Sequence, residues 1–264
     1  MGILTLTTDF GTEDGNVGVM KGVALGIAPA LQIVDITHQV APQNIRQAAF
    51  VLARQIFYFP GGSVHVVVVD PGVGTDRRPI AARVGGQLLV GPDNGVFTPL
   101  YQRAELHGWP LEIVDLTAGQ QFWRNEISHV FHGRDVFAPV GAHLASGVGL
   151  HQVGVPVEDP VLIPWPEAAR QGNQIWGEVT YIDHFGNLFT NMHAADLAGE
   201  EILAVKLAGV EIEGMVNAFG ERGPGTLIAL YSSTDELLIA EVNGSAAMKV
   251  GAKVGDQVLV NLRG

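Results

Sequence analysis

One stretch of the sequence, HVVVVDPGVGTDRR (65–78), places charged side chains directly after four consecutive valines. The valine run predicts a buried strand that ends at Asp70, and the glycine-rich turn lets Arg77 or Arg78 fold back onto the carboxylate. A buried carboxylate needs such a cationic partner. The pattern indicates either a structural ion pair or a charge-paired aspartate that takes part in catalysis.

A second candidate segment is FHGRDVFAPVGAHL (131–144). His132 precedes Gly133 at a predicted helix start, with Asp135 in the first turn, where the helix dipole favours negative charge. Taken alone, His132 fits a packed or capping histidine better than a catalyst. His143 falls inside the helical pattern and is interpreted as structural.

The third candidate segment is TYIDHFGNLFTN (180–191). Asp183, Phe185 and Asn187 alternate, so in a strand they would point to one face. A carboxylate, an aromatic ring and an amide together could grip a cationic amine and a flat heterocycle. A hairpin turn at FGN fits the same letters equally well.

The elements that must position these residues follow from the apolar pattern. Strands are predicted at 2–8, 31–37, 64–70 and 111–116, and a helix at 45–56, which indicates an α/β domain with a mostly parallel sheet and flanking helices. Asp9 and Asp70 then follow the carboxyl ends of two strands, where open α/β sheets bind ligands. Either aspartate could instead cap a turn, but two such ends in one sheet favour a site.

The composition of the sequence changes around residues 161–172, VLIPWPEAARQG, and this segment suits a linker. Beyond it, short strand-like segments separated by turn residues indicate an all-β barrel or sandwich. The predicted organisation is an N-terminal α/β domain over 1–165 and a C-terminal all-β, barrel-like domain over 173–264.

Composition excludes several classes of function. The formal net charge of −12 argues against a nucleic-acid or anionic-membrane partner. There is no cysteine, and neither the histidines nor the carboxylates show a metal-binding spacing, so no metal is expected. GVGTDRR is neither a dinucleotide fingerprint nor a P-loop. With no signal peptide or membrane helix in the pattern, a cytoplasmic protein is expected.

Six segments taken in order resemble the S-adenosyl-L-methionine (SAM) hydroxide adenosyltransferases, the SAM hydrolases related to fluorinase and chlorinase enzymes. They are TTDFGTEDG, VVDPGVGTDRR, GPDNGVF, FHGRD, IDHFGN and NGSAA, and they span nearly the whole chain. The resemblance implies an α/β domain followed by a β-barrel, SAM as the substrate, and no cofactor. It also implies a homotrimer with the substrate bound between neighbouring subunits.

The resemblance assigns a catalytic Asp–Arg–His set to Asp70, Arg77 and His132, with Arg77 preferred over Arg78 by its spacing from Asp70. In the implied reaction, water displaces methionine at the ribose C5′, and the set activates that water. Because Arg77 lowers the basicity of Asp70, His132 is favoured as the proton acceptor or relay, and the sequence leaves both His132 and Asp70 open for that role.

The resemblance also assigns substrate-binding residues. Asp9 matches the ligand of the ribose diol and Asp183 the carboxylate that holds the methionine amine, while Phe185 and Asn187 match adenine contacts. Ser233 falls near the position that binds the methionyl end, and Asn243 lies in the NGSAA segment. At Ser233 the chain reads YSSTDELL where similar proteins tend to have Asn-Ser and a glycine.

Two other functions remain open from the sequence. One is halide-dependent adenosyl transfer, as in a chlorinase. The other is a non-catalytic SAM- or adenosine-binding protein that uses the same pocket.

Overall fold

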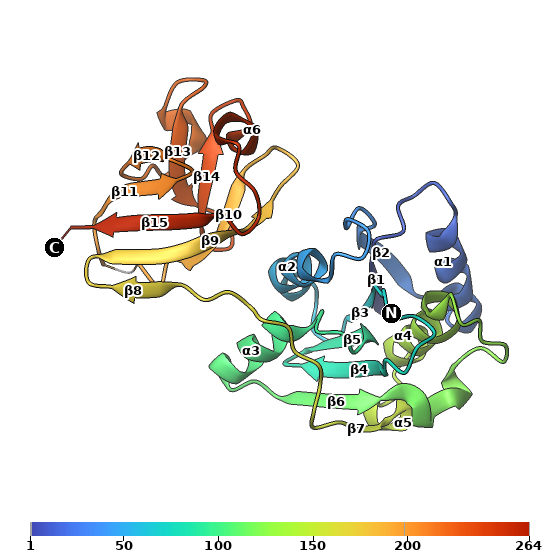
Figure 1. Cartoon of the computed structure of the whole chain (residues 1–264). Helices are drawn as coiled ribbons and strands as arrows, with labels where there is room; N and C mark the ends of the chain where they lie inside the picture. The colour runs from blue at the N-terminus through green and yellow to red at the C-terminus, as the bar shows by residue number, and fades with distance from the viewer. Residues whose placement is uncertain (1, 198, 264) are drawn as a thin grey trace. The chain divides into compact units, whose positions relative to one another are not determined.

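The computed structural model describes residues 2–197 and 199–263, and the chain divides into two compact units, residues 1–164 and 165–264. The elements of the first unit (Figure 1) are β1 (Ile3–Thr8), α1 (Asn16–Ile27), β2 (Gln32–Thr37), α2 (Ile45–Gln55), the 3₁₀ turn η1 (Ile56–Tyr58), β3 (Val64–Val68), β4 (Pro79–Val84), β5 (Gln87–Pro92), α3 (Thr98–His107), β6 (Leu111–Asp115), the 3₁₀ segment η2 (Leu116–Phe122), the π-turn η3 (Gly133–Phe137), α4 (Ala138–Ala145), α5 (Leu150–Val153) and β7 (Val155–Pro156).

The first unit is built on one twisted sheet of order β2-β1-β3-β5-β4-β6-β7. β2, β1, β3 and β5 pair in parallel, whereas β4 runs against both β5 and β6. β6 therefore runs in the direction of β1 again, and the α/β fold with a mostly parallel sheet is confirmed. The β4–β5 hairpin is an addition to the strands that the sequence predicts.

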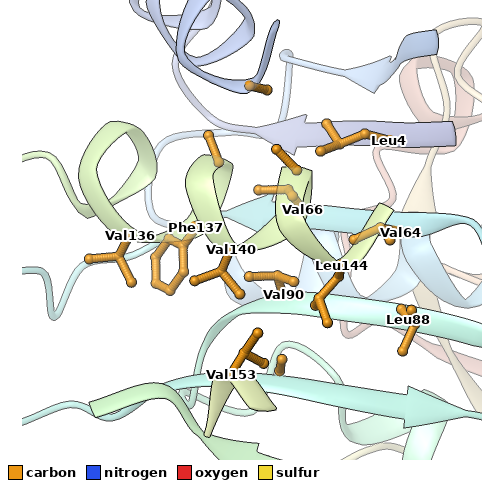
Figure 2. Packing of buried hydrophobic residues seen from close by; sticks show 14 of the residues in the cluster. Leu4, Val64, Val66, Leu88, Val90, Val136, Phe137, Val140, Leu144 and Val153 are labelled. Atoms are coloured by element: carbon orange, nitrogen blue, oxygen red, sulfur yellow. The ribbon is translucent and has the colours of Figure 1, made fainter. Parts of the chain in front are cut away.

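Both faces of this sheet are covered, and the side chains of β3 show why. Val64, Val66 and Val68 pack into one hydrophobic cluster with residues of β1, α1 and α4. Val67 and Val69 pack into a second cluster with α2 and α3 on the opposite face. Alternation along the strand sends successive valines to opposite faces, so the uninterrupted valine run is the signature of a strand buried on both sides. Figure 2 shows the first of the two clusters, with Val64 and Val66 of β3 near Val140 and Leu144 of α4.

The second unit is an antiparallel, nearly closed barrel. Its elements are β8 (Ala169–Gln171), β9 (Gln174–Ile182), β10 (Leu188–His193), β11 (Ile202–Leu207), β12 (Val210–Glu213), the 3₁₀ turn η4 (Phe219–Glu221), β13 (Leu227–Tyr231), β14 (Glu236–Glu241), α6 (Ala246–Val250) and β15 (Gln257–Leu262). The strand order is β12-β11-β15-β9-β10-β14-β13. Val216 N, just after β12, donates to Ala229 O in β13 at 2.9 Å, which joins the two ends of the sheet.

Part of the predicted linker belongs to this barrel. Residues 169–171 form β8 and pair antiparallel with β9. The linker is therefore shorter than the predicted segment 161–172. None of the described helices is long and apolar enough to cross a membrane.

The buried His65 makes the stability of the first unit depend on pH. Its ring lies between Thr5 Oγ1 and Gln87 Oε1, at 2.8 and 3.2 Å, and burial lowers its pKa to about 4 from 6.5. Below pH 6.5 His65 is protonated in the unfolded chain, whereas in the folded chain it stays neutral until the pH approaches 4. The stability that this histidine contributes is therefore complete above pH 6.5 and falls by about 3 kcal/mol as the pH drops to 4.

Urea unfolding of the wild type and of His65→Gln, at pH 7 and pH 4.5, measures this contribution. The stability difference between the two proteins is expected to shrink on acidification, because glutamine does not titrate. A difference that stays the same at both pH values would contradict a buried neutral His65.

Candidate active site

Asp9 and Asp70 lie side by side at the carboxyl edge of the sheet. β1 and β3 are adjacent parallel strands in register Thr8↔Val68, Asp9 follows Thr8 directly, and Asp70 comes two residues after Val68. The expectation that these two aspartates follow strand ends of one sheet is confirmed, and the structure adds that the two strands are neighbours. This edge is where open α/β sheets bind ligands.

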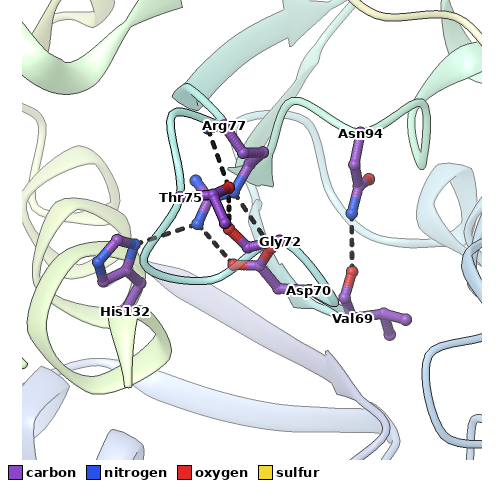
Figure 3. Close-up of polar contacts among 7 residues, drawn as sticks. All are labelled: Val69, Asp70, Gly72, Thr75, Arg77, Asn94 and His132. Carbon is purple, nitrogen blue, oxygen red and sulfur yellow. Dashed lines mark hydrogen bonds and ion pairs between the residues drawn. The ribbon is translucent and has the colours of Figure 1, made fainter. Parts of the chain in front are cut away.

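Asp70 forms a two-point ion pair with Arg77. Arg77 Nε donates to Asp70 Oδ1 at 3.1 Å and Nη2 donates to Oδ2 at 2.6 Å (Figure 3). The two side chains are only 4% and 8% exposed, so each charge depends on the other for its solvation.

The loop between Asp70 and Arg77 is held by its own turns. Val73 N donates to Asp70 O and Thr75 N to Gly72 O, both at 3.2 Å, and the Thr75 hydroxyl donates to the same Gly72 carbonyl. Gly74 has φ of 76° and packs so closely that a Cβ there would lie 2.2 Å from His129 O. Only glycine satisfies both conditions, which explains the glycine-rich turn.

Arg78 points elsewhere, which resolves the choice between the two arginines. Its guanidinium pairs with Asp93 through Nε at 2.9 Å and with Asp159 through Nη1 at 2.8 Å. Arg77 is therefore the partner of Asp70, as the resemblance implies.

His132 reaches the same ion pair from a different element. It immediately precedes the π-turn η3, which continues into α4, so the predicted helix start is confirmed. Arg77 Nη2 lies 3.1 Å from His132 Nδ1. A guanidinium has donors only, so Nδ1 must accept, and the proton of the neutral ring sits on Nε2.

Burial and the guanidinium set the protonation behaviour of this set. Desolvation raises the pKa of Asp70 above its usual value, against the opposing effect of Arg77. Desolvation and then the charge of Arg77 lower the pKa of His132. The arrangement favours a neutral histidine beside a carboxylate that accepts protons more readily than one paired in water.

Asp135 has a structural role in this region. It is fully buried, accepts from Arg134 Nε at 2.7 Å and from Ser128 N at 2.9 Å, and its pKa is lowered by these partners against the effect of burial. It ties the segment before His132 to the π-turn. His143 packs edge-on against Phe122 with ring centroids 5.1 Å apart, away from the ion pair's hydrogen bonds, in keeping with its structural interpretation.

Asp9 is oriented by the chain that follows β2. Gln43 N donates to Asp9 Oδ2 at 2.7 Å, and Gly11 N donates to His38 O at 2.9 Å. Gln43 has φ of 65°, an unusual conformation for a residue with a side chain. The structure positions one oxygen of Asp9 in this way, and its role toward a ribose stays a prediction.

In the second unit, Asp183, Phe185 and Asn187 occupy the turn between β9 and β10. Of the two interpretations that the sequence left open, the hairpin turn is correct and the strand is wrong, because Asp183 Oδ1 accepts from both Phe185 N and Asn187 N at 2.9 Å. Asn187 Nδ2 also donates to Asp183 Oδ2 at 2.8 Å, and Phe185 is 72% exposed. The turn still brings a carboxylate, a buried amide and an exposed ring together.

The NGSAA segment packs directly against this turn. A Cβ on Gly186 would lie 2.0 Å from Ser245 Oγ, and Ala247 N donates to Gly186 O at 2.9 Å. Asn243, in the left-handed conformation with φ of 56°, begins that segment. Two of the segments that carry the resemblance therefore meet in space, although about 60 residues separate them in the sequence.

Ser233 does not join this group. It lies in the turn between β13 and β14, where Ala194 N donates to Asp235 O at 2.8 Å, next to the His193 end of β10. The Asp183 turn lies at the opposite end of β10, where Leu188 pairs with Ile239. Within this unit the structure separates Ser233 from the other predicted binding residues by the length of a strand.

Asn94 is a residue that the sequence analysis missed. Its Nδ2 donates to Val69 O, directly before Asp70, at 2.9 Å (Figure 3). The Asn-Gly pair predicts a tight turn, but it does not predict that the Asn94 side chain contacts Val69, 25 residues earlier in the chain. Among the described residues no group of three or more His, Cys, Asp or Glu side chains could hold a metal ion.

Ionisable groups at the carboxyl edge of a mostly parallel sheet, with a separate antiparallel barrel after it, give the chain the architecture of a two-unit α/β enzyme. Comparison with known families identifies it more closely. The model of the SAM hydroxide adenosyltransferase N-terminal domain matches residues 4–154, and that of the C-terminal domain matches residues 177–259. The chain belongs to the SAM hydroxide adenosyltransferase family.

Individual relatives agree with the family models over nearly the full length. The (R)-S-adenosyl-L-methionine hydrolase of Salinispora tropica is 38% identical, over 97% of each chain. A fluorinase of Nocardia brasiliensis is more distant, 28% identical over 98% of this chain and 97% of its own. The crystal structure of an uncharacterized conserved protein from Thermotoga maritima is similar with a TM-score of 0.90 and 35% identity, covering 98% of this chain and 99% of that one.

Proposed function

We propose that this protein is a SAM hydrolase that converts SAM and water to adenosine, L-methionine and a proton. The observation that carries the proposal is the Asp70–Arg77–His132 set at the carboxyl edge of the sheet, with its buried Asp70–Arg77 pair. The hydrolases among its relatives act on the (R) form of SAM, so we propose the same sulfonium epimer as the substrate here.

The physical difficulty of this reaction lies in the nucleophile. The sulfonium departs as a neutral thioether, so the leaving group needs no acid. Forming free hydroxide from water at pH 7 costs roughly 12 kcal/mol. The site must instead remove the proton while the oxygen attacks C5′.

The hydrogen-bond geometry favours Asp70 over His132 as the proton acceptor, which reverses the expectation from the sequence. His132 Nδ1 faces a donor of Arg77 at 3.1 Å, and protonating that nitrogen would set two N–H groups against each other. Its Nε2 already carries the proton of the neutral ring. Asp70 keeps unshared electron pairs, and its burial raises its pKa.

A carboxylate suffices if the proton leaves late. As the bond between the water oxygen and C5′ forms, the C5′–S bond breaks with its electron pair on sulfur, and the attacking oxygen becomes strongly acidic. Asp70 then takes one proton and later releases it to solvent. In this proposal Arg77 holds the Asp70 carboxylate in its orientation through the two-point contact, and the Nε2–H of His132 donates to and orients the attacking oxygen.

We propose that the turn of the second unit supplies the substrate contacts. The Asp183 carboxylate suits the methionine amine, and the exposed Phe185 ring and Asn187 amide suit adenine. Asn243 lies in the segment packed on that turn. Asp9 suits the ribose diol because a carboxylate accepts from two hydroxyls. Ser233, which lies at the other end of β10 from this turn, is proposed to contact the methionyl end.

We further propose a homotrimer with sites shared between subunits, a protein without metal or cofactor, and a cytoplasmic location. These rest on the family resemblance and on the chemistry, which needs no Lewis acid. Light scattering that reports a fully active monomer of 28.0 kDa would contradict the shared site, and cell fractionation tests the location.

One experiment separates hydrolysis from the alternatives. SAM is incubated with the protein in H₂¹⁸O, with excess chloride or fluoride and with EDTA, and the products are analysed by mass spectrometry. We expect adenosine labelled at its 5′-hydroxyl and free methionine, because a carboxylate about 4 Å from the attacking atom repels a halide by ~4 kcal/mol. A 5′-halo-adenosine as the main product, activity that EDTA abolishes and a divalent ion restores, or tight binding without turnover would each refute the proposal.

A further inference from the structure

We propose that Asp93 and Asn94 are positioning residues that clamp both ends of the loop carrying Asp70 and Arg77. The catalytic part of this inference rests on the proposed hydrolysis of SAM. The clamp holds Val69 at one end of the loop and Arg78 at the other, and each is the immediate neighbour of a member of the ion pair.

The first contact of the clamp lies beyond the end of the β3–β5 pairing. That parallel pairing ends at Val66↔Val90, three residues before Val69. Val69 is fully buried, and Asn94 Nδ2 donates to its carbonyl at 2.9 Å. The Asn94 side chain thus extends the sheet by one hydrogen bond, directly before Asp70.

The backbone of the turn fixes Asn94 itself. Asn94 N donates to Pro92 O at 3.0 Å, and Val96 N donates to Asn94 Oδ1 at 3.2 Å. With its oxygen engaged by Val96, the amide must present its Nδ2 hydrogens to Val69. These contacts assign the orientation of the amide, which the position of its heavy atoms alone does not decide.

The second contact of the clamp is made by the preceding residue. Asp93 N donates to Arg78 O at 3.0 Å, and Asp93 Oδ2 accepts from Arg78 Nε at 2.9 Å. Asp93 is buried, and its other oxygen accepts from Val161 N at 2.8 Å. Arg78 is therefore held through both its main chain and its side chain, directly after Arg77.

Asp70 and Arg77 are thus each one residue away from a clamped position, Val69 before Asp70 and Arg78 after Arg77. The turn that carries the clamp comes from a different part of the chain, residues 91–97, and holds the two ends of the loop together. Releasing one end lets Asp70 shift relative to Arg77 and His132. Small displacements of a catalytic group are costly, because proton transfer requires the attacking water within hydrogen-bond reach.

Asn94→Asp tests the clamp with little change in volume. Aspartate keeps the acceptor for Val96 N but loses the donor to Val69 O. We expect kcat for SAM hydrolysis to fall roughly 10-fold to 10²-fold, with less than about a threefold change in KM, because no substrate contact is altered. The acid limb of the kcat–pH profile should move to higher pH, since Asp70 displaced from Arg77 loses the partner that lowers its pKa.

Asp115→Ala is the matched control. It also removes one side chain to backbone hydrogen bond in the first unit, from Thr117 N to Asp115 Oδ1 at 2.8 Å. Its kcat and pH profile should remain those of the wild type. If Asn94→Asp also keeps the wild-type kcat and pH profile, or if both variants lose activity equally, the clamp is overturned.

A crystal structure of Asn94→Asp tests the clamp independently of SAM. The clamp requires the Asp70 carboxylate to move out of its two-point contact with Arg77, and an unchanged contact overturns it. If the wild type does not hydrolyse SAM, the proposed function fails while this structural result still decides the clamp.

Discussion

Replacing Asp70 with asparagine is expected to lower the turnover of SAM by roughly 10²-fold to 10⁴-fold, the usual contribution of a positioned proton acceptor. The amide has nearly the same shape but cannot accept the proton as C5′ is attacked. Binding of SAM should change far less, because the substrate contacts are assigned to other residues. Single-turnover kinetics and calorimetric titration with SAM measure the two effects separately.

The same loop offers a matched control for this substitution. Asp76 is exposed and lies directly before Arg77, so Asp76→Asn makes the same chemical change without touching the ion pair. It should retain wild-type turnover. His132→Ala is expected to lose about 10²-fold or more, through loss of the Nε2–H donor. Wild-type turnover in Asp70→Asn would remove Asp70 from the mechanism.

Arg77→Ala is expected to lower turnover by at least about 10²-fold and to destabilise the protein by about 3–5 kcal/mol. The large stability effect follows because Asp70, 4% exposed, would remain as a buried charge without its partner. Urea unfolding and steady-state kinetics at several pH values measure both effects. As a control, Arg83→Ala removes the more exposed pair with Glu112, at 3.4 Å, and should cost about 1 kcal/mol or less.

The pH dependence of this variant has a defined sign. The guanidinium lowers the pKa of Asp70 and of His132, so both pKa values should rise when it is removed. As the pH falls, residual activity should therefore be lost at a higher pH than in the wild type. If Arg77→Ala does not fold, Arg77→Lys keeps a cation without the two-point contact. An unchanged acid limb together with wild-type turnover in the lysine variant would contradict the role assigned to Arg77.

Local pattern was enough to predict much of the first unit. β3 stands out because a strand buried on both faces leaves a nearly uninterrupted apolar run. β1 and β2 stand out as short segments rich in apolar and β-branched residues, and α2 stands out by its apolar face. The β4–β5 hairpin was not predicted, although its strands PIAARV and QLLVGP are joined by Gly85 and Gly86, a two-residue hairpin connection. Its antiparallel direction depends on pairing with β6, which is distant in the sequence.

The family resemblance identified more residues of the candidate site than the local residue pattern did. The residues alone left Arg77 and Arg78 equivalent and gave His132 no partner. Arg78 meets Asp93 and Asp159 across 15 and 81 residues, and Arg77 meets His132 across 55 residues. The structure decides both questions through Asp93 and Asp159, which take Arg78, and through the π-turn that brings His132 to Arg77.

In the second unit, the local residue pattern did not predict where the candidate binding residues lie. Alternation at Asp183, Phe185 and Asn187 fits a strand and a turn equally, and hydrogen bonds from the turn's own backbone to Asp183 decide for the turn. The position of Ser233 at the far end of β10 follows from strand register, which sequence spacing does not encode.

The sequence by itself thus determined the fold class, the family and the identity of the ionisable residues, because these depend on local composition and on the order of segments. Only the tertiary structure decided which charges meet, which nitrogen of His132 carries the proton and why Asn94 matters. Those properties arise from burial and from hydrogen bonds between distant segments, and they exist only once the sheet has formed.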